Sequence, residues 1–504
     1  ATFVPGTTLS VGNSENVVTN AGLMTPGDMQ LAQRTDLTGS FVQSSTGVML
    51  SELDFVSDNI DQIRASGTAD LNGEVVVSLL NPQAVRAGEF SKVLYSGEEG
   101  VTDSGLFLTT TSSQVITYDL FYRGETEAML GYEVDFAVNG TGDNLSAVGE
   151  YINRLQNAGS NLELASVIST LLYIPDEATY RQAISQMSPD FYGEHQVEMV
   201  ASQQDFAQAM MSCRQAGGVH RFTREGSCIW LQGDSYQTTR ASFGDYKRST
   251  SSGNRFSLGV QKTFANDWSA GIALSRQDHE SNGYAGAWQS RGMTKQVGMS
   301  VKYRSGPTKV ALAASYGWNN TDTSRRGHLV ESFYASVERH MKIMGGQLRL
   351  SYDIEGKPEN VYGRPILEAG VSHVKTDAAQ EAGAGAISLV LPGHTETDLW
   401  VSPGFEVGAE FKLSEDLNMR LFASIALKHY LTDGNSTVLA GLAAAPDGVD
   451  PITVSMGLGQ DSWVARTGID LTLTENLSLR LQYNRTVADH VTTNSGLMKL
   501  ALPF

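Results

Sequence analysis

The chain contains little cysteine and proline and no long apolar run. Its 504 residues include 2 Cys and 13 Pro. No stretch approaches the roughly 20 consecutive apolar residues that a membrane-spanning helix needs, which argues against a helical membrane protein. A membrane strand needs only about 10 residues of alternating polarity, so spanning as a β-barrel stays open. The length of the chain indicates more than one domain.

Basic residues are scarce in the amino-terminal third. Residues 1–150 hold 5 Lys+Arg and 20 Asp+Glu, a net charge of −15, whereas the remaining residues hold 31 and 35, a net charge of −4. Such an acidic segment repels nucleic acid and anionic lipid head groups, so we expect no nucleic-acid partner. We interpret the charge as an exposed, solvated surface.

Residues 1–140 also lack helical periodicity. Short apolar runs are interrupted by Gly, Asn and Asp; within Gly67–Leu79, a predicted Asn-Gly turn at Asn72 separates two runs. Short strands with frequent turns favour a β-solenoid, whose rungs stack over a thin core, and a β-sandwich is the alternative. We expect a β-helix-like domain over residues 1–140.

Residues 141–215 switch to a helical period. Val148, Tyr151, Ile152 and Leu155 share one helical face, which predicts an amphipathic helix. Toward its end the segment becomes small and polar on nearly all sides, as suits a helix in water or in a narrow polar tube. The polar residues of this last helix are Gln203, Gln204, Asp205, Gln208 and Ser212.

Residues 216–504 alternate apolar and polar side chains. Phe256, Leu258 and Val260, for example, are separated by Ser, Gly and Gln, which predicts a strand with two different environments on its faces. Twelve candidate strands follow, at residues 228–242, 253–264, 268–278, 292–304, 308–320, 336–354, 360–374, 396–412, 416–431, 458–473, 476–487 and 492–504.

The connections between these strands differ in length in a regular way. Every second one is short, as at residues 265–267, 305–307 and 474–475, and those between are long, as at 277–291 and 321–336. A soluble sandwich has no reason to gather its short turns at one end, but an outer-membrane barrel has short periplasmic turns and long outer loops. We therefore expect a mostly β protein whose carboxy-terminal part is a 12-stranded transmembrane antiparallel barrel.

Aromatic and apolar residues near the strand ends agree with a barrel in lipid. Aromatic girdles mark the two membrane interfaces of such barrels, and the last strand keeps an apolar outer face. The predicted girdle residues are Trp230, Tyr303, Tyr352, Tyr362, Trp400, Tyr430 and Trp463, and the outer face of the last strand is Met498, Leu500, Leu502 and Phe504.

Six stretches carry a resemblance to one protein family. They are SGTADLNGEVVVSLL at 66–80, a helical segment at 147–210, FSLGVQKTFANDWSAGIALS at 256–275, RPILEAGVSHV at 364–374, LFASIALKHYLTDG at 421–434 and ARTGIDLTLTENLSLRLQYN at 465–484. In this order they resemble the passenger end, the helical linker and the barrel strands of a monomeric autotransporter of type V secretion.

The resemblance implies a protein of the bacterial outer membrane that translocates its own amino-terminal passenger and displays residues 1–140 at the cell surface. The linker helix at 141–215 would end inside the barrel lumen. Outer-membrane lipid, the barrel-assembly machinery and periplasmic chaperones would be the partners. The outer face of the last strand, Met498, Leu500, Leu502 and Phe504, would be the assembly signal.

We expect an adhesive or structural passenger without a cofactor. Two other functions stay open: a surface-anchored or secreted enzyme whose catalytic part lies upstream of Ala1 or is unrecognised, and a porin-like channel. Gly233-Asp234-Ser235 is similar to the nucleophile block of some esterases, but it lies in a predicted barrel strand without an Asp-x-x-His partner, so we expect no catalytic role. The His residues lack metal-ligand spacing, and Asp54, Asp58 and Asp61 lack the Gly-rich repeat of calcium β-rolls.

Cysteine and arginine supply the remaining candidate sites. Cys213 and Cys228 bracket the junction between the last helix and the first strand; in an oxidising compartment we expect a disulfide worth about 3 kcal/mol. Arg466, Arg480 and Arg485 are expected to face the lumen. They would pair with helix carboxylates such as Glu198 or Asp205.

Overall fold

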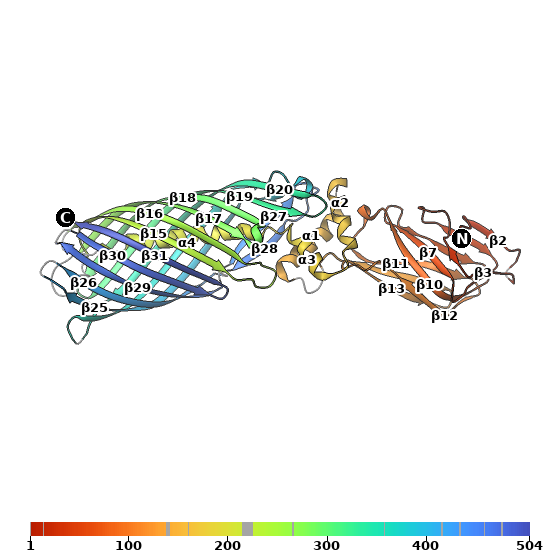
Figure 1. Cartoon of the computed structure of the whole chain (residues 1–504), viewed down its shortest axis with the longest axis horizontal. Coiled ribbons are helices and arrows are strands. Elements are labelled where there is room, and N and C mark those ends of the chain that lie inside the picture. Colours follow the sequence, from red (N-terminus) through yellow and green to blue (C-terminus); the bar gives the residue numbers. More distant parts are fainter. Residues whose placement is uncertain are drawn as a thin grey trace.

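The computed structural model describes residues 2–13, 15–137, 142–159, 161–213, 225–264, 267–356, 358–414, 417–432, 435–457, 459–474 and 477–504. A β-solenoid, a helical segment and a β-barrel follow one another along the long axis of the molecule (Figure 1). The predicted domain boundaries after residues 140 and 215, and parts of the short turns at 265–267 and 474–475, lie outside the described residues.

The solenoid consists of stacked strands that run mostly parallel. One sheet has the order β1-β4-β7-β10-β6-β3 with β12 and β8 attached, and the other has the order β13-β14-β11-β9-β5-β2. The strands are β1 (Thr2–Phe3), β2 (Thr8–Ser10), β3 (Val17–Asn20), β4 (Leu23–Met24), β5 (Arg34–Thr38), β6 (Ser40–Gln43), β7 (Val48–Asp54), β8 (Asn59–Ile60), β9 (Gln62–Ala65), β10 (Thr68–Leu80), β11 (Gly88–Gly97), β12 (Gly100–Thr109), β13 (Ile116–Arg123) and β14 (Glu127–Val134).

The rungs of the solenoid differ in length, which hides the repeat in the sequence. Phe41 pairs with Val18, 23 residues earlier, and with Ala69, 28 residues later. Ala69 in turn pairs with Val101, 32 residues later. A hairpin, β13–β14, joins β11 in antiparallel fashion and ends the stack. The predicted solenoid is confirmed, and its irregular period explains why no strict repeat is visible.

The predicted hairpin turn at Asn72 is wrong. β10 continues in the same direction through Asn72 and Gly73, from Thr68 to Leu80, and the bulge opposite them lies in β12, where Ser104 is an extra residue. The Asn72 side chain accepts a hydrogen bond from the Gly73 N–H and donates one to the Ser104 carbonyl. Gly73 has φ +74°, and a Cβ there would lie 2.4 Å from the Gly47 carbonyl oxygen, so the position requires glycine. The strand continues through the Asn-Gly pair because parallel neighbours hold both halves.

Helices fill the middle of the molecule. They are α1 (Asp143–Ala158), α2 (Leu162–Ser169), α3 (Glu177–Ser185) and α4 (Gly193–Met210), with 3₁₀ turns η1 (Pro82–Ala84), η2 (Thr170–Tyr173) and η3 (Asp190–Tyr192). The predicted apolar face of α1 is buried: Val148, Ile152 and Leu155 are 0% exposed. Asn161 and Asp176 cap α2 and α3 by accepting backbone N–H groups of the first turn.

Twelve long antiparallel strands in the described residues form a closed barrel. Closure comes from pairing of β15 with β31 and of β20 with β22. The strands are β15 (Cys228–Arg240), β16 (Ser249–Phe264), β17 (Trp268–Gly283), β18 (Trp288–Ser305), β19 (Thr308–His328), β20 (Ser332–Tyr352), β22 (Val361–Thr376), β25 (His394–Lys412), β26 (Asn418–Tyr430), β29 (Asp461–Thr474), β30 (Leu477–Ala488) and β31 (Val491–Pro503). A short β21 (Ile354–Glu355) follows β20 and pairs with β22.

The barrel wall separates an apolar exterior from a polar lumen. Phe256 and Leu258 are 63% and 52% exposed on the outside, whereas Ser257 between them is buried inside. Met498, Leu500, Leu502 and Phe504 lie on the outer face of β31 and its end, as predicted. Among the described helices, none combines the length and apolarity needed to span a membrane.

Four of the predicted girdle aromatics point the other way. Tyr303, Tyr352 and Trp463 are exposed outside, but Trp230, Tyr362, Trp400 and Tyr430 are at most 5% exposed and face the lumen. Position near a strand end does not fix the face; the period of two does. Trp268, Tyr316 and Trp318 are exposed aromatics of the outer wall that the sequence analysis left out.

The predicted long loops are largely ordered. β17 to β20 extend far beyond the expected strand ends, so that most of residues 277–291 and 321–336 is strand, with η5 (Tyr284–Gly286) between β17 and β18. Two further connections form a small sheet of β23 (Ala379–Gln380), β24 (Leu389–Leu391), β27 (Asn435–Leu442) and β28 (Ile452–Gly457), with η6 (Gly385–Ile387). Continued backbone pairing satisfies N–H and C=O groups that a loop would leave to water.

Candidate functional site: the barrel lumen and its helix

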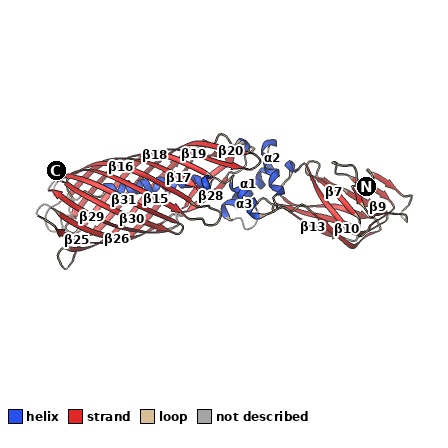
Figure 2. Ribbon diagram, viewed as in Figure 1, coloured by secondary structure: helices blue, strands red, loops and turns tan. Residues whose placement is uncertain are grey.

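Helix α4 lies inside the barrel, with its amino-terminal end toward the other helices (Figures 1 and 2). Its side chains meet the inward side chains of the wall. Ser202 Oγ donates to Gln277 Oε1 at 2.7 Å and accepts from Gln296 Nε2 at 2.8 Å. Gln203 Nε2 donates to Ser315 Oγ at 3.1 Å. The small polar surface of the helix therefore matches a lumen lined with Ser and Gln.

All five polar residues singled out in this helix segment contact the wall. Gln203 Oε1 also accepts from Ser372, and Gln204 Oε1 accepts from Lys428. Asp205 pairs with Arg255 at 3.1 Å, and Gln208 Nε2 donates to Glu368 at 2.9 Å. The Ser212 carbonyl accepts from Lys499 at 2.7 Å. Contacts of α4 fall mainly on β17 to β22, so the helix lies closer to that side of the barrel.

Close approach of the helix depends on small residues in the wall. A Cβ on Gly345 would lie 2.3 Å from the Gln203 amide, and one on Gly298 would lie 2.5 Å from the Met210 methyl group. Ala313 is fully buried in the same cluster as Ala207 of the helix. Since side chains of ordinary size would exclude the helix, these positions hold it at contact distance.

Arg255 is a lumen residue that the sequence analysis missed. Its guanidinium lies 3.1 Å from Asp205 of the helix and 3.3 Å from Asp234 of β15, and it donates to the Ser202 carbonyl at 3.0 Å. Arg255 therefore joins the helix to two strands. The sequence indicates that Arg255 faces inward, because it is next to the outward Phe256. It does not indicate which residues Arg255 contacts.

The three arginines predicted to face the lumen do not all do so. Arg480 faces inward and pairs with Asp470 at 2.6 Å, and Arg466 lines the lumen. Arg485 lies on the outer face with Tyr483 and is exposed, so its predicted position is wrong. It is an odd number of residues from Arg480, and strand faces alternate with a period of two.

The predicted partners of these arginines are also wrong. Asp205 pairs with Arg255, and Glu198 accepts from Ser281 at 2.9 Å and lies 3.7 Å from His279. Arg480 reaches its partner on the neighbouring strand, not on the helix. Strand register, which decides these pairs, is set between distant segments.

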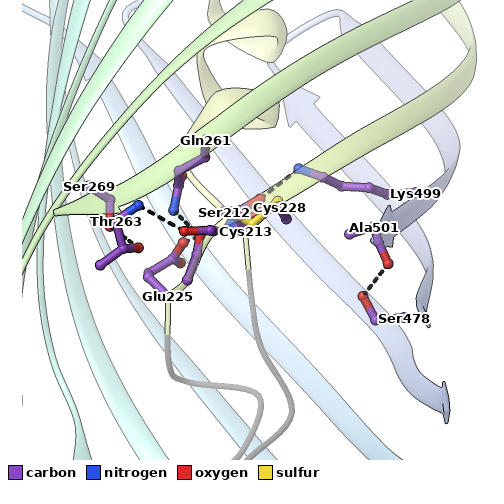
Figure 3. Close-up of a disulfide and its surroundings, with 12 residues drawn as sticks. Ser212, Cys213, Glu225, Cys228, Gln261, Thr263, Ser269, Ser478, Lys499 and Ala501 are labelled. Atoms are coloured by element: carbon purple, nitrogen blue, oxygen red, sulfur yellow. Dashed lines mark hydrogen bonds between the residues drawn. A yellow bond between two sulfur atoms is a disulfide. The ribbon is translucent and has the colours of Figure 1, made fainter. Parts of the chain in front are cut away.

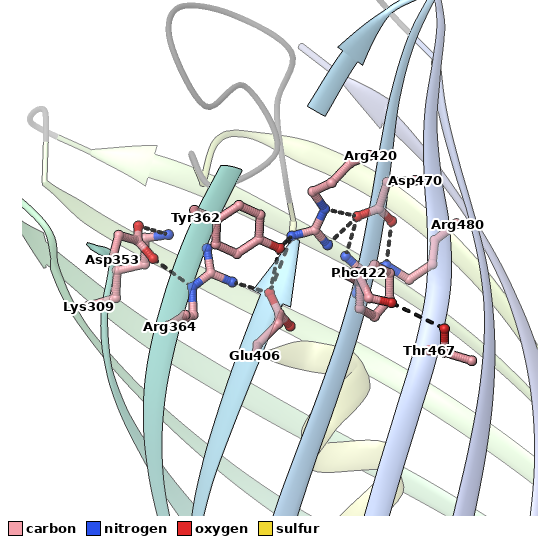
Figure 4. Close-up of polar contacts among 10 residues, drawn as sticks. All are labelled: Lys309, Asp353, Tyr362, Arg364, Glu406, Arg420, Phe422, Thr467, Asp470 and Arg480. Carbon is pink, nitrogen blue, oxygen red and sulfur yellow. Dashed lines mark hydrogen bonds and ion pairs between the residues drawn. The ribbon is translucent and has the colours of Figure 1, made fainter. Parts of the chain in front are cut away.

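Inside the lumen, charged residues of neighbouring strands form a connected network (Figure 4). Arg420, fully buried, donates to Asp470 at 2.8 Å and to Glu406 at 3.4 Å. Glu406 also accepts from Arg364 at 2.9 Å, and Arg364 pairs with Asp353 at 2.6 Å. Each buried charge has an opposite partner, which offsets the cost of removing it from water.

The carboxy-terminal end of α4 is tied to the wall by a disulfide and by Lys499 (Figure 3). The Cys213–Cys228 disulfide joins the helix segment to the start of β15, with 6.3 Å between the Cα atoms, and confirms the predicted pairing. Lys499 Nζ donates to the carbonyls of Ala209 and Ser212 at 2.7 Å each. A cation at the end of a helix satisfies carbonyls that have no partner within the helix.

At its other end the helix is tied to buried side chains of β15, β16, β18 and the connection between β15 and β16. Glu194 accepts hydrogen bonds from Tyr246 and Ser249 and lies 3.7 Å from Arg240. His195 Nε2 lies 2.9 Å from Ser290 Oγ. Helix α4 is therefore fixed at its two ends and along its length.

The residues considered for other chemistry are occupied in structural contacts. Asp234 pairs with Arg255, and Ser235 is exposed on the outer face of β15. In the solenoid, Asp61 accepts from the backbone N–H groups of Gln33 and Glu52, and burial raises its pKa to about 7. Within the described ranges, no three His, Cys, Asp or Glu residues are grouped so that they could hold a metal ion.

Comparisons with known proteins assign the chain to a family. A model of the autotransporter beta-domain family matches residues 229–484, just over half of the chain. The fold is similar to the translocator domain of NalP from Neisseria meningitidis (15% identity, 62% of this chain and 98% of that one, TM-score 0.48) and to the transport unit of AIDA-I from Escherichia coli (15%, 60% and 98%, 0.42). It is also similar to the beta domain of the Bordetella autotransporter BrkA (12%, 56% and 100%, 0.42), and no curated protein matches the chain. With a family model that spans most of the barrel, the chain belongs to the autotransporter family, whose barrels lie in the outer membrane and secrete a passenger.

Proposed function

We propose that the barrel carries the solenoid of its own chain to the cell surface, and that the solenoid acts there as an adhesive or structural element. The observation that carries this proposal is the course of the chain. From the solenoid it passes through the helices, enters the lumen as α4 and reaches the opposite end of the barrel at Cys213, beside the start of β15. A chain that lies along the lumen has the arrangement expected once its passenger has passed outward.

Polar residues buried in the solenoid support a structural role. Gln43 donates to the Glu74 carbonyl and accepts from Tyr95 at 2.9 Å. Asp54 accepts from the N–H groups of Val56 and Ser57 and from Asn81 at 2.6 Å. These groups satisfy backbone donors at the bends of the rungs, as a stacked scaffold requires, and their hydrogen-bonding capacity is used there.

Protease shaving of intact cells tests the proposal. Protease added outside should release fragments from residues 1–140, identified by amino-terminal sequencing, while the barrel stays in the membrane. If those fragments appear only after the cells are lysed, the solenoid is not at the surface and the proposal is wrong. Release of a longer catalytic fragment from a precursor would favour the alternative of a secreted enzyme.

A passive channel is the second candidate function. Because α4 lies nearer to β17–β22, polar cavities of about 160 and 180 Å³ remain beside it, and Arg466 and Asn484 line both. Steady, large currents of the whole chain in planar bilayers would favour a channel. Small currents that grow only when the helix is displaced would favour the occupied lumen of a transporter.

We also infer that barrel-assembly machinery reads the outer face of β31. Met498, Leu502 and Phe504 are 51%, 52% and 61% exposed, so this face is presented to a partner along one strand. Phe504→Ala should lower the yield of folded barrel severalfold, measured as the heat-resistant form in gels. Phe411→Ala, which removes another exposed Phe from β25, is the control. Equal yields from the two variants would contradict the inference.

A further inference from the structure

A row of basic side chains crosses five neighbouring strands on the outside of the barrel. Strand register places Arg276 opposite Lys295, Lys295 opposite Trp318, Trp318 opposite Lys342 and Lys342 opposite Lys375. All four basic residues are exposed, and Trp318 is 42% exposed. We name these residues of β17, β18, β19, β20 and β22 the basic row.

The basic row marks the edge of the apolar band. The nearest exposed apolar residues on the membrane side of the row are Leu274, Val297, Tyr316, Met344 and Val371, between 37% and 61% exposed. Acidic residues such as Asp278, Asp322 and Glu338 come only farther along the strands, away from the apolar band. The cations therefore lie where hydrocarbon gives way to head groups.

Like charges stand directly opposite each other in this row. The Arg276–Lys295 and Lys342–Lys375 pairs are cross-strand neighbours, and like charges in that position repel. Arg276 has a partner in Asp278 at 3.1 Å, but in the described ranges no salt bridge reaches Lys295, Lys342 or Lys375. An anion from outside the protein would relieve this repulsion.

The strands that follow β17 around the barrel, β16, β15 and β31, have no such row. The outward residues past the apolar band on β15, β16 and β31 are Ser235, Asn254 and Gly496, which are uncharged. Arg485 of β30 is another exposed basic residue of the outer wall, but its cross-strand neighbours are Ala465 and Asn494. The row of adjacent cations therefore lies on the side on which β17 to β20 extend outward. A general need for solubility would not produce this asymmetry.

We propose that the basic row binds phosphate groups of anionic lipid in the outer leaflet, with Trp318 seated between head group and acyl chain. Juxtamembrane Lys and Arg attract such lipids, and Lys binds phosphate as a point charge. The bound lipid orients the barrel and holds its extended wall upright. The acidic solenoid, with its net charge of −15 over residues 1–150, is kept away from the same surface.

Native mass spectrometry of the full chain in mixed micelles tests this proposal. The probe is bis-phosphorylated lipid A, compared with the same lipid after removal of its phosphates. Lys342→Gln/Lys375→Gln should weaken lipid binding about tenfold or more, at about 1 kcal/mol per basic residue. Lys262→Gln/Arg485→Gln, which removes two exposed basic residues elsewhere on the outer wall, should leave binding unchanged.

Two controls keep the result decisive. Lys342→Arg/Lys375→Arg retains the charge and should retain binding, and the heat-resistant gel form shows that each variant is folded. Equal binding by the Gln variant and the control variant would overturn the proposal. So would equal binding of lipid with and without phosphate.

Discussion

At the scale of single residues, the lumen is governed by charges that neutralise one another. Arg420 is fully buried, and its guanidinium lies between Asp470 and Glu406 on the two neighbouring strands. The same holds for Arg255 between Asp205 and Asp234. A buried ion pair adds little net stability, but the loss of one partner leaves a charge in a site of low dielectric constant. Lumen residues should therefore be far more sensitive to substitution than basic residues outside.

Replacing Arg420 by Met tests this contrast. The substitution removes one of the cations that Asp470 and Glu406 share, although Arg480 and Arg364 stay beside them, so we expect a loss of about 1.5–3 kcal/mol in stability. Arg485→Met on the outer wall is the matched control and should change stability by less than about 0.5 kcal/mol. Loss of the heat-resistant gel form with temperature measures both variants. A similar effect of the two substitutions would contradict the assigned positions.

In the solenoid, Asp61 makes stability depend on pH. Burial, with Glu52 nearby, raises its pKa from the ordinary 3.8 to about 7, although backbone N–H groups act in the opposite direction. Between these values the folded state keeps a proton that the unfolded state has lost. Stability is therefore highest at and below about pH 4 and falls as the pH rises toward 7.

Hydrogen exchange of residues 49–65, corrected for intrinsic rates, should show slower opening at about pH 4.5 than at about pH 7.5. Asp61→Asn should remove this difference. It also loses one hydrogen bond from a backbone N–H group, because an amide nitrogen cannot accept one. Asp119→Asn, which changes an exposed carboxylate, should keep it. A wild-type chain whose exchange is independent of pH would show that Asp61 is ionised throughout.

At the scale of secondary-structure elements, α4 and the wall are matched by size as well as polarity. Adjacent glycines of β20 illustrate the point. Gly345 faces the helix, and a Cβ there would lie 2.3 Å from Gln203, whereas Gly346 faces outward and its nearest neighbour would be at 3.8 Å. One glycine is required by the helix, and the other is not.

Gly345→Val should displace or strain α4, with a cost of about 1–3 kcal/mol for overpacking. Single-barrel currents in planar bilayers should become larger and more variable, because the helix no longer fills its place in the lumen. Gly346→Val should behave like the wild type in the same measurement. If both variants conduct alike, the helix does not depend on this contact.

At the scale of the whole molecule, one hydrophobic core runs from the solenoid into the outer loops. It includes Leu71 of the solenoid, Ile152 of α1 and Val454 of β28. Polar contacts follow the same path: the Leu442 N–H donates to Tyr151 Oη at 3.0 Å, and Asn144 exchanges hydrogen bonds with the Ser455 backbone. The helices, and through them the solenoid, therefore pack against the small sheet of the outer connections.

Val454→Asp should weaken the packing of the helices on the small sheet and leave the barrel folded. An unpaired carboxylate in the core costs several kcal/mol, so protease should cut the α1 region faster on intact cells. Thr453→Asp places the same charge on an exposed neighbour and should have little effect. The heat-resistant gel form, which reports the barrel, should stay unchanged in both variants.

Local patterns alone predicted the barrel strands, the amphipathic face of α1, the small polar surface of α4 and the outer face of β31. Each depends on a period of two or of 3.6 residues, which the chain carries in any short window. The same parity, applied strictly, would have placed Arg485 outside and Trp400 inside. Those two errors came from judging a residue by its type or by its distance from a strand end.

The sequence by itself determined which face each residue takes and that Cys213 and Cys228 would meet across a short segment. The folded chain alone shows which charges pair, that β10 continues through Asn72 and Gly73 without reversing, and that the outer connections form a sheet against α1. The physical reason is range. Side-chain direction follows from the local backbone, whereas strand register and through-space contacts join residues that are tens to hundreds of positions apart.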